Sequence, residues 1–230
     1  MTGGTRLTAR RKSSRRFTMA FAGDQPITHI TDHAVGAVFL QSHHNGRLVV
    51  LAHDYTGRWN DGELHTTLRL PLGKGKPGES IGATLNREMI EEVAAEPGDF
   101  DFEILSPAPL YWEVVPHDAT GERSHLKVVF AARIKRGHIR NFACVDDAGT
   151  FEEETHGPLQ FLEITRVLSR MWKEKSPRVH RLAVVGALYW CARQNPRIAE
   201  FYRRLRDERA RDLAAFEPYH PVVNEYLARG

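Results

Sequence analysis

The feature that most constrains the fold of this chain is residues 73–95, a glycine-rich stretch that leads into an amphipathic helical pattern (GKGKPGESIGATLNREMIEEVAA). Leu85, Met89 and Val93 recur every four residues and form an apolar stripe that must pack against a core. Ser80 is a suitable N-cap for this helix. Glycines and a proline at positions 73–78 let the backbone turn tightly and approach a phosphate closely. The sequence therefore predicts a rigidly held helix behind a phosphate-sized turn.

The opposite face of this helix carries three carboxylates, Glu88, Glu91 and Glu92, at the spacing i, i+3 and i+4. Like charges this close repel one another unless a cation lies among them, and hard oxygen ligands suit Mg²⁺ or Mn²⁺ better than zinc. Taken alone, such a triplet is more often a solvated acidic surface. The residues around it favour a metal site instead.

The whole stretch resembles the Nudix box, the family pattern G-x5-E-x7-R-E-U-x-E-E-x-G-U in which U is a bulky aliphatic residue. The matching positions are occupied by Gly73, Glu79, Arg87, Glu88, Met89, Glu91 and Glu92. Ala94 stands where the pattern has its last glycine, and Ala95 stands where it has a bulkier residue. The missing glycine would serve as a helix C-cap, so the departure concerns the end of the helix and not the metal ligands.

The resemblance implies a Mg²⁺- or Mn²⁺-dependent hydrolase that cleaves the diphosphate of a nucleoside diphosphate linked to another group, X. The expected metal ligands are Glu88, Glu91 and Glu92. Glu79 is expected as a further ligand or one that binds through water. Arg87 is expected to orient the carboxylates by charge-assisted hydrogen bonds.

The resemblance also implies a further glutamate, a metal ligand or general base, from a loop after the last strands. The sequence DDAGTFEEETHG at residues 146–157 supplies the candidates Glu152, Glu153 and Glu154, and an exposed acidic loop is the equal alternative.

Residues 47–80 are similar to ADP-ribose and ADP-sugar pyrophosphatases, which have an L-P-x-G entry to the box, so ADP-ribose or an ADP-sugar is the expected substrate. Gly73 would lie against the substrate, and Trp59, Tyr111 or Trp112 could stack on a base, although a large aromatic is more often part of a core. Tyr111 and Trp112 also lie near a tyrosine position of dinucleoside polyphosphate hydrolases.

The remaining pattern predicts an α/β fold, an α/β/α sandwich with a mixed sheet and a helical C-terminal extension. Strands are expected at residues 34–40, 47–53, 64–72, 102–115 (interrupted by two prolines) and 126–134. Helices are expected at residues 159–171, 179–194 and 197–216. We expect a basic tail at residues 1–23, a hydrolase domain at 24–175, and an extension at 176–230 that packs on the core or on a second subunit.

Charge and cysteine content narrow the remaining possibilities. The net charge is +3, and much of the positive charge lies in the first residues, before the first acidic residue, Asp24. A disordered tail is the favoured interpretation, with an RNA contact or an organelle transit peptide as alternatives. The two cysteines are far apart, which fits a reducing cytoplasm, and no apolar run approaches the roughly 20 residues of a membrane span.

A small nucleotide and a second copy of the chain are therefore the expected partners. Two other functions stay open at this point. One is a Nudix-like ligand-sensing transcription regulator with a helical DNA-binding C-terminus, and the other is an RNA 5′-end pyrophosphohydrolase.

Overall fold

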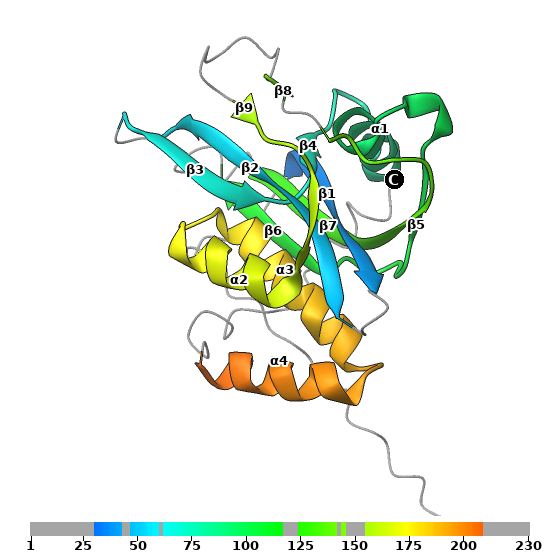
Figure 1. Ribbon diagram of the computed structural model, residues 1–230. Coiled ribbons are helices and arrows are strands. Elements are labelled where there is room, and N and C mark those ends of the chain that lie inside the picture. The colour runs from blue at the N-terminus through cyan, green and yellow to red at the C-terminus, as the bar shows by residue number, and fades with distance from the viewer. Residues whose placement is uncertain are drawn as a thin grey trace, which may run out of the picture.

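The computed structural model describes residues 30–42, 47–59, 62–116, 124–141, 144–145 and 155–208. Within these ranges a mixed β-sheet separates helix α1 (Ile81–Val93) from helices α2 (Ile164–Lys173) and α3 (Arg178–Ala192), as Figure 1 shows. The expected α/β architecture is confirmed. A short 3-10 turn, η1 (Pro97–Asp99), follows α1, and helix α4 (Pro196–Glu208) follows α3.

The strands of the sheet are, in chain order, β1 (Ile30–Ser42), β2 (Leu48–Arg58), β3 (Leu64–Arg69), β4 (Leu72–Lys74), β5 (Asp101–Ile104), β6 (Tyr111–Pro116), β7 (Ser124–Arg136), β8 (Cys144–Val145), β9 (Thr155–His156) and β10 (Gln160–Glu163). The order across the sheet is β5-β7-β1-β2-β9-β8, with β3 and β10 also paired to β2, β4 to β1 and β6 to β7. The β1–β7 pair is parallel and the other pairs are antiparallel, so the sheet is mixed.

Strand β1 is the centre of the fold. Its residues are buried without interruption from His33 to Leu40, which is the pattern of a strand covered on both faces. Its register with β7 runs from Ile30 opposite Ser124 to Phe39 opposite Ala132. Strand β1 is therefore buried in the core and also pairs with β4, the strand that leads into the glycine-rich turn.

Helix α1 forms where the sequence predicts it. Ser80 is its N-cap, with a side chain that accepts a hydrogen bond from the Ala83 N–H, and the stripe of Leu85, Met89 and Val93 is buried. The helix ends without a glycine, because Ala94 takes an extended conformation and forms a β-bridge with Ile139. A strand-like exit replaces the left-handed C-cap of the family pattern.

Two sequence-based assignments are wrong in detail. Residues 64–72 do not form one strand: Pro71 lacks the N–H that a ladder needs, and the Leu70 N–H donates to His180 Nδ1, so the chain leaves β2 and pairs with β1 as β4. The helix expected from residue 159 begins at Ile164, because Gln160–Glu163 extends the sheet as β10.

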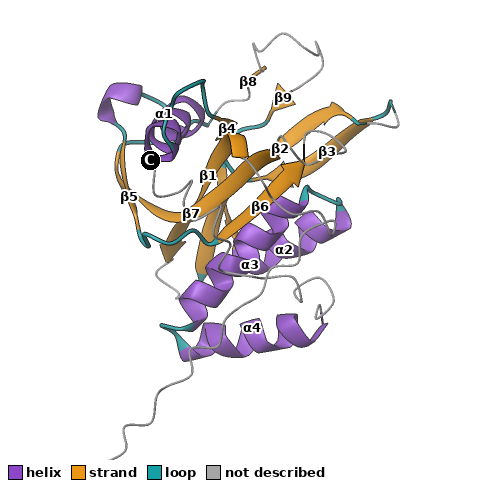
Figure 2. Cartoon of the chain, turned by 180° about the vertical axis from the view of Figure 1, so that it is seen from behind, coloured by secondary structure: helices purple, strands orange, loops and turns teal. Residues whose placement is uncertain are grey.

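Helix α3 lies against the sheet and contributes to the main core. Val184, Val185 and Leu188 are buried among the sheet residues, and Gly186 lets the helix approach the carbonyl oxygen of Leu110. Helix α4 packs on α3, as seen from behind in Figure 2. The expected boundary after residue 175 therefore falls between α2 and α3, which both contact this sheet.

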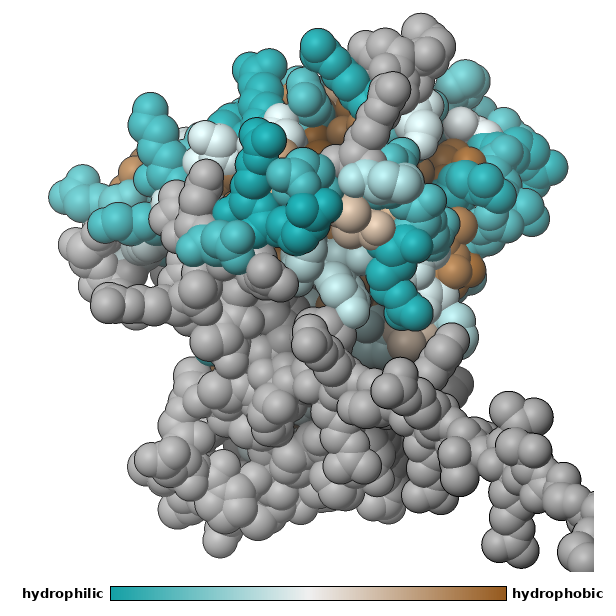
Figure 3. Space-filling model, turned by 90° about the horizontal axis from the view of Figure 1, so that it is seen from below, coloured by the Kyte–Doolittle hydropathy of each residue, from teal (hydrophilic) through white to brown (hydrophobic). Residues whose placement is uncertain are grey.

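The described surface is largely polar. Leu64, Ile104 and Val115 are the large hydrophobic residues it exposes, and Figure 3, a view from below, shows apolar residues only in small separate areas of the coloured surface. None of the described helices combines the length and the apolar character that crossing a membrane requires.

Substituting Gly186 by alanine should destabilise the fold, although alanine is the better helix former by about 1 kcal/mol. A Cβ atom at this position would lie 2.5 Å from the Leu110 carbonyl oxygen, so helix or loop must shift. We expect the free energy of unfolding in urea to fall by about 1–3 kcal/mol. Gly98→Ala is the matched control, because a Cβ there meets nothing within 4 Å. Equal stability of the two variants would contradict close docking of α3.

Candidate active site

The turn before α1 brings the backbone of Gly73 against the side chain of Glu88. Gly73 pairs with Val35 of β1, and a Cβ atom on it would lie 1.8 Å from Glu88 Oε2. No other residue type leaves room for that carboxylate. The glycine predicted to lie against a substrate is thus also required by the position of a predicted metal ligand.

Arg87 lies among the carboxylates of the helix and the turn. Its Nε and Nη2 donate to the two oxygens of Glu79 at 2.9 and 2.8 Å, a bidentate pair. Its Nη1 donates to Glu88 at 2.6 Å and to Glu91 at 2.9 Å, and Nη2 also donates to the Lys74 carbonyl at 2.9 Å. The orienting role expected for Arg87 agrees with these contacts.

Burial and hydrogen bonding move the pKa values of these groups in opposite directions. Hydrogen bonds from Arg87, and then from the Lys76 N–H, hold the pKa of Glu79 well below its usual range. Burial raises the pKa of Glu88, and the hydrogen bond from Arg87 opposes that effect. Glu79 is therefore firmly ionised, whereas Glu88 gains from any additional positive charge placed beside it.

Glu79 accepts four hydrogen bonds from protein donors. It accepts from Arg87 Nε, Arg87 Nη2, the Lys76 N–H and the Thr84 hydroxyl. Three of these bonds end on Oε2 and one ends on Oε1, so Oε2 is enclosed by protein donors while Oε1 keeps one lone pair. This arrangement favours a role in holding Arg87 and the turn.

The other three carboxylates of the box lie on α1 and accept hydrogen bonds from different donors. Glu92 accepts from the Leu72 N–H at 2.9 Å, which orients it toward β4, and Glu88 and Glu91 share one guanidinium nitrogen. All four box carboxylates offer hard oxygen ligands, and together with Arg87 they leave a negative excess. Within the described ranges, no three Asp, Glu, His or Cys side chains are grouped closely enough to hold a metal ion. In the box, the Arg87 guanidinium lies among the carboxylates.

The loop candidates Glu152, Glu153 and Glu154 lie outside the described residues. The chain is described again from β9, which pairs His156 with Tyr55 and Thr155 with Thr56 of β2.

Two of the three aromatic residues proposed for base stacking are buried. Tyr111 and Trp112 are 2% and 5% exposed within the core, so the structure does not support base stacking by either ring. Trp59 follows the end of β2, where its ring lies 4.7 Å from that of His65.

Sequence reasoning missed a cluster of planar groups on β2, β3 and β9. His53 stacks on His156 at 4.9 Å between ring centroids, Tyr55 meets His156 edge-on, and the Arg69 guanidinium lies 3.4 Å from the centre of the Tyr55 ring. Asp54, between them in sequence, bonds Arg170 of α2 at 2.7 Å. Side chains alternate along a strand, so the cluster faces away from α2, on the side of the sheet that carries α1. The alternation of His53 and Tyr55 was the available signal.

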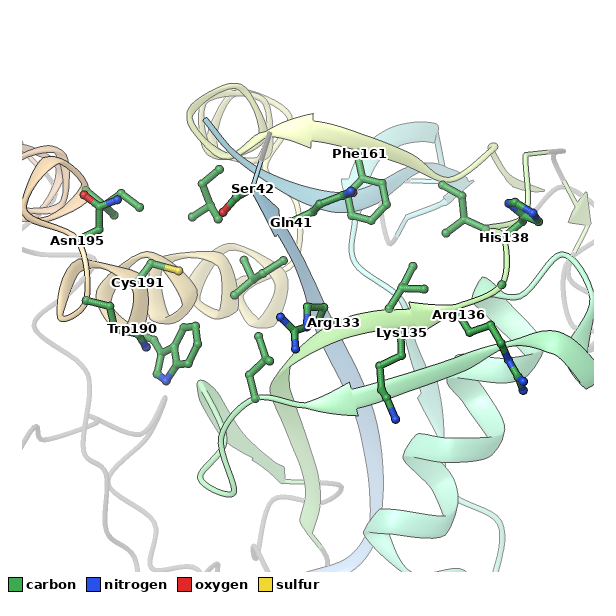
Figure 4. Close-up of a pocket in the computed structure, with 18 residues that line it drawn as sticks. Gln41, Ser42, Arg133, Lys135, Arg136, His138, Phe161, Trp190, Cys191 and Asn195 are labelled. Atoms are coloured by element: carbon green, nitrogen blue, oxygen red, sulfur yellow. The ribbon is translucent and has the colours of Figure 1, made fainter. Parts of the chain in front are cut away.

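A groove of about 1060 Å³ lies at the other end of β1. Figure 4 shows Arg133, Lys135 and Arg136 of β7 with Trp190 and Cys191 of α3 around it. These cations already pair with acidic side chains of β5 and the turn before it, as Lys135 does with Asp101 at 3.2 Å. No box residue lines the groove, so we do not assign the active site to it.

No family model matches this chain, and no curated protein matches it. Similar solved structures include a NUDIX hydrolase from Nitrosomonas europaea, at 18% identity over 64% of this chain and 82% of that one, with a TM-score of 0.40. A C. elegans Ap4A hydrolase is 15% identical over 70% and 98%, with a TM-score of 0.41. An ADP compounds hydrolase is 15% identical over 71% and 75%, with a TM-score of 0.43. These identities and TM-scores are low, and this chain resembles the Nudix hydrolases in the residues of the box.

The buried His53 should make the fold sensitive to acid. Burial, with nearby positive charge, lowers the pKa of His53 from 6.5 to about 3, so the folded state holds it neutral while the unfolded chain binds a proton. Its stabilising contribution is complete above pH 6.5 and decreases as the pH falls toward 3. We expect the free energy of unfolding in urea to be about 2 kcal/mol lower at pH 5 than at pH 6.5 because of this residue alone. His53→Phe keeps a flat ring and should show a correspondingly weaker pH dependence; an unchanged dependence would refute the assignment.

Proposed function

We propose that this protein is a Nudix hydrolase that uses Mg²⁺ or Mn²⁺ to cleave the diphosphate of a nucleoside diphosphate linked to X. The observation that carries the proposal is the carboxylate cluster of α1, held by one guanidinium directly behind a glycine-rich turn. Bound metal supplies neutralising charge to the phosphates and lowers the pKa of a coordinated water.

The residues have distinct parts in this proposal. Glu88, Glu91 and Glu92 hold the metal. Arg87 fixes the position of the helix carboxylates relative to the turn. Gly73 leaves room for the Glu88 carboxylate beside the turn that would receive the phosphates. Because the anhydride oxygens are already negative, attack by water depends on this positioned positive charge.

For the substrate, we propose ADP-ribose or an ADP-sugar. The support is the L-P-x-G entry to the box, Leu70 to Gly73, and the planar cluster on the same side of the sheet. Arg69 and His156 are its half-buried members, and flat groups of this kind stack on nucleotide bases.

We also propose a homodimer in a reducing, cytoplasmic setting. The resemblance to ADP-ribose hydrolases supports the dimer. The two cysteines, which lie far apart in the sequence, support the setting.

Glu92→Gln tests the proposal most directly. The amide keeps the shape of the side chain and its acceptor oxygen for the Leu72 N–H, but removes the charge that a metal needs. With Mg²⁺ or Mn²⁺ and a panel of ADP-ribose, ADP-sugars, dinucleoside polyphosphates, NADH, coenzyme A and capped RNA, we expect turnover to fall about a hundredfold or more. Near-normal turnover by a folded variant at saturating metal would exclude Glu92 as a ligand.

A second test addresses the loop glutamates. Glu152, Glu153 and Glu154 should each be changed singly to Gln, and the pH dependence of kcat compared with that of the unchanged protein. We expect one of the three changes to lower kcat by about 10²–10⁴-fold, the usual contribution of a general base. If the rate and its pH profile survive all three changes, the base lies elsewhere.

A further inference from the structure

His33 of β1 contacts the box at two places. Its Nε2 lies 2.8 Å from the hydroxyl of Thr84 on α1, and that hydroxyl donates to Glu79 Oε2 at 3.0 Å. Its backbone carbonyl accepts a hydrogen bond from the Gly75 N–H at 2.8 Å. One residue of the central strand therefore joins the turn, the helix and the carboxylate between them.

The direction of these hydrogen bonds follows from counting protons. A hydroxyl has one hydrogen, and that of Thr84 is donated to Glu79, so the hydroxyl must accept from His33. Burial lowers the pKa of His33, which keeps the ring neutral near pH 7. The ring hydrogen is therefore on Nε2, and the chain of donors runs from His33 through Thr84 to Glu79.

Little water can replace these contacts. His33 is 4% exposed and Thr84 is fully buried. A Cβ atom on Gly75 would lie 2.4 Å from His33 Nε2, so the ring also fills the space beneath the turn. A buried polar group that loses its partner under these conditions carries a large desolvation cost.

We propose that His33 is a positioning residue of the active site: through Thr84 it fixes Glu79, which holds Arg87 and thereby the carboxylates of Glu88 and Glu91. The proposal rests on the function proposed above in one respect only, that these carboxylates bind a divalent cation. Thr84 and His33 are buried, and they act by setting the geometry of the carboxylates.

The arrangement gives the box a link to the rigid core. Glu79 sits on the turn, where it accepts from Arg87 and from the Lys76 N–H. The Thr84 hydroxyl sits on α1, the element that carries the metal face. Because metal sites depend on such outer contacts for orientation, loss of this bond should affect metal affinity more than nucleotide affinity.

Thr84→Val and Thr84→Ser form a matched pair for the test. Valine keeps the branched shape without the hydroxyl, and serine keeps the hydroxyl without the methyl group. Binding of Mn²⁺ alone should be followed by electron paramagnetic resonance, with kcat and KM for the best nucleotide of the panel. We expect Thr84→Val to weaken Mn²⁺ binding about tenfold and to lower kcat similarly, with KM changed less than about twofold. Thr84→Ser should stay within about threefold of the unchanged protein in both measurements.

A double-mutant cycle with His33→Phe, which keeps a flat ring under the turn, tests whether His33 acts through Thr84. The double variant should bind Mn²⁺ no more weakly than the weaker single variant, since both changes break one chain of contacts. Additive losses, or Mn²⁺ binding unaffected by either single change, would overturn the proposal. If His33→Phe does not fold, His33→Leu takes its place in the same cycle, and the same two outcomes decide the proposal.

The Mn²⁺ titration separates this inference from the proposed hydrolase activity. Failure of every nucleotide in the panel with the unchanged protein would count against the hydrolase, while the metal data would still report on the positioning role. Normal hydrolysis with no difference between valine and serine at position 84 would count against the positioning role alone.

Discussion

The contact on which the candidate site depends is the guanidinium of Arg87 among its carboxylates. Glu88 is 8% exposed, and a carboxylate buried to that degree would be strongly destabilising without a positive partner. Arg87 supplies that partner and also binds Glu79, Glu91 and the backbone of β4, so the same charge joins the turn to the helix. Removing the arginine would leave carboxylates facing one another with no fixed geometry.

The hydrogen bonds around Arg87 have a fixed geometry because the turn and helix α1, which they join, are both attached to strand β1. The turn is held through the β1–β4 pair and through the hydrogen bond from Gly75 to His33, and α1 is held by its apolar stripe. Helix α3 covers β1, β6 and β7 from the other side and completes the core. The C-terminal helices thus contribute to the site indirectly, by burying the face of the sheet opposite the box.

Local sequence patterns are sufficient to predict the structure of the box, but not that of the segments around it. The N-cap of α1, its buried stripe and the face of its carboxylates follow from spacing alone. The strand also breaks at Pro71 because the Leu70 N–H donates to His180, more than a hundred residues away. No local sequence pattern predicts that contact. The sequence predicts helix at Gln160–Glu163 because the apolar residues Phe161 and Leu162 suit either element until β2 is there to pair with them. Base stacking by Tyr111 and Trp112 is a reasonable expectation from the sequence, because burial of these rings is a tertiary property.

The box carboxylates divide into two kinds, and the division follows from hydrogen bonding and not from position on the helix. Glu79 accepts four hydrogen bonds from protein donors, three of them at Oε2, and its pKa is held low, which makes it an anchor for Arg87 and the turn. Glu88 shares one nitrogen of Arg87 with Glu91, and burial raises the Glu88 pKa, so it gains most when a cation arrives. A metal ion would therefore complete the environment of Glu88 without disturbing Glu79. The Glu79–Arg87 pair and the turn can then stay in place while the Glu88 and Glu91 oxygens turn from Arg87 toward the ion, so the frame of the site is organised in advance of its ligand.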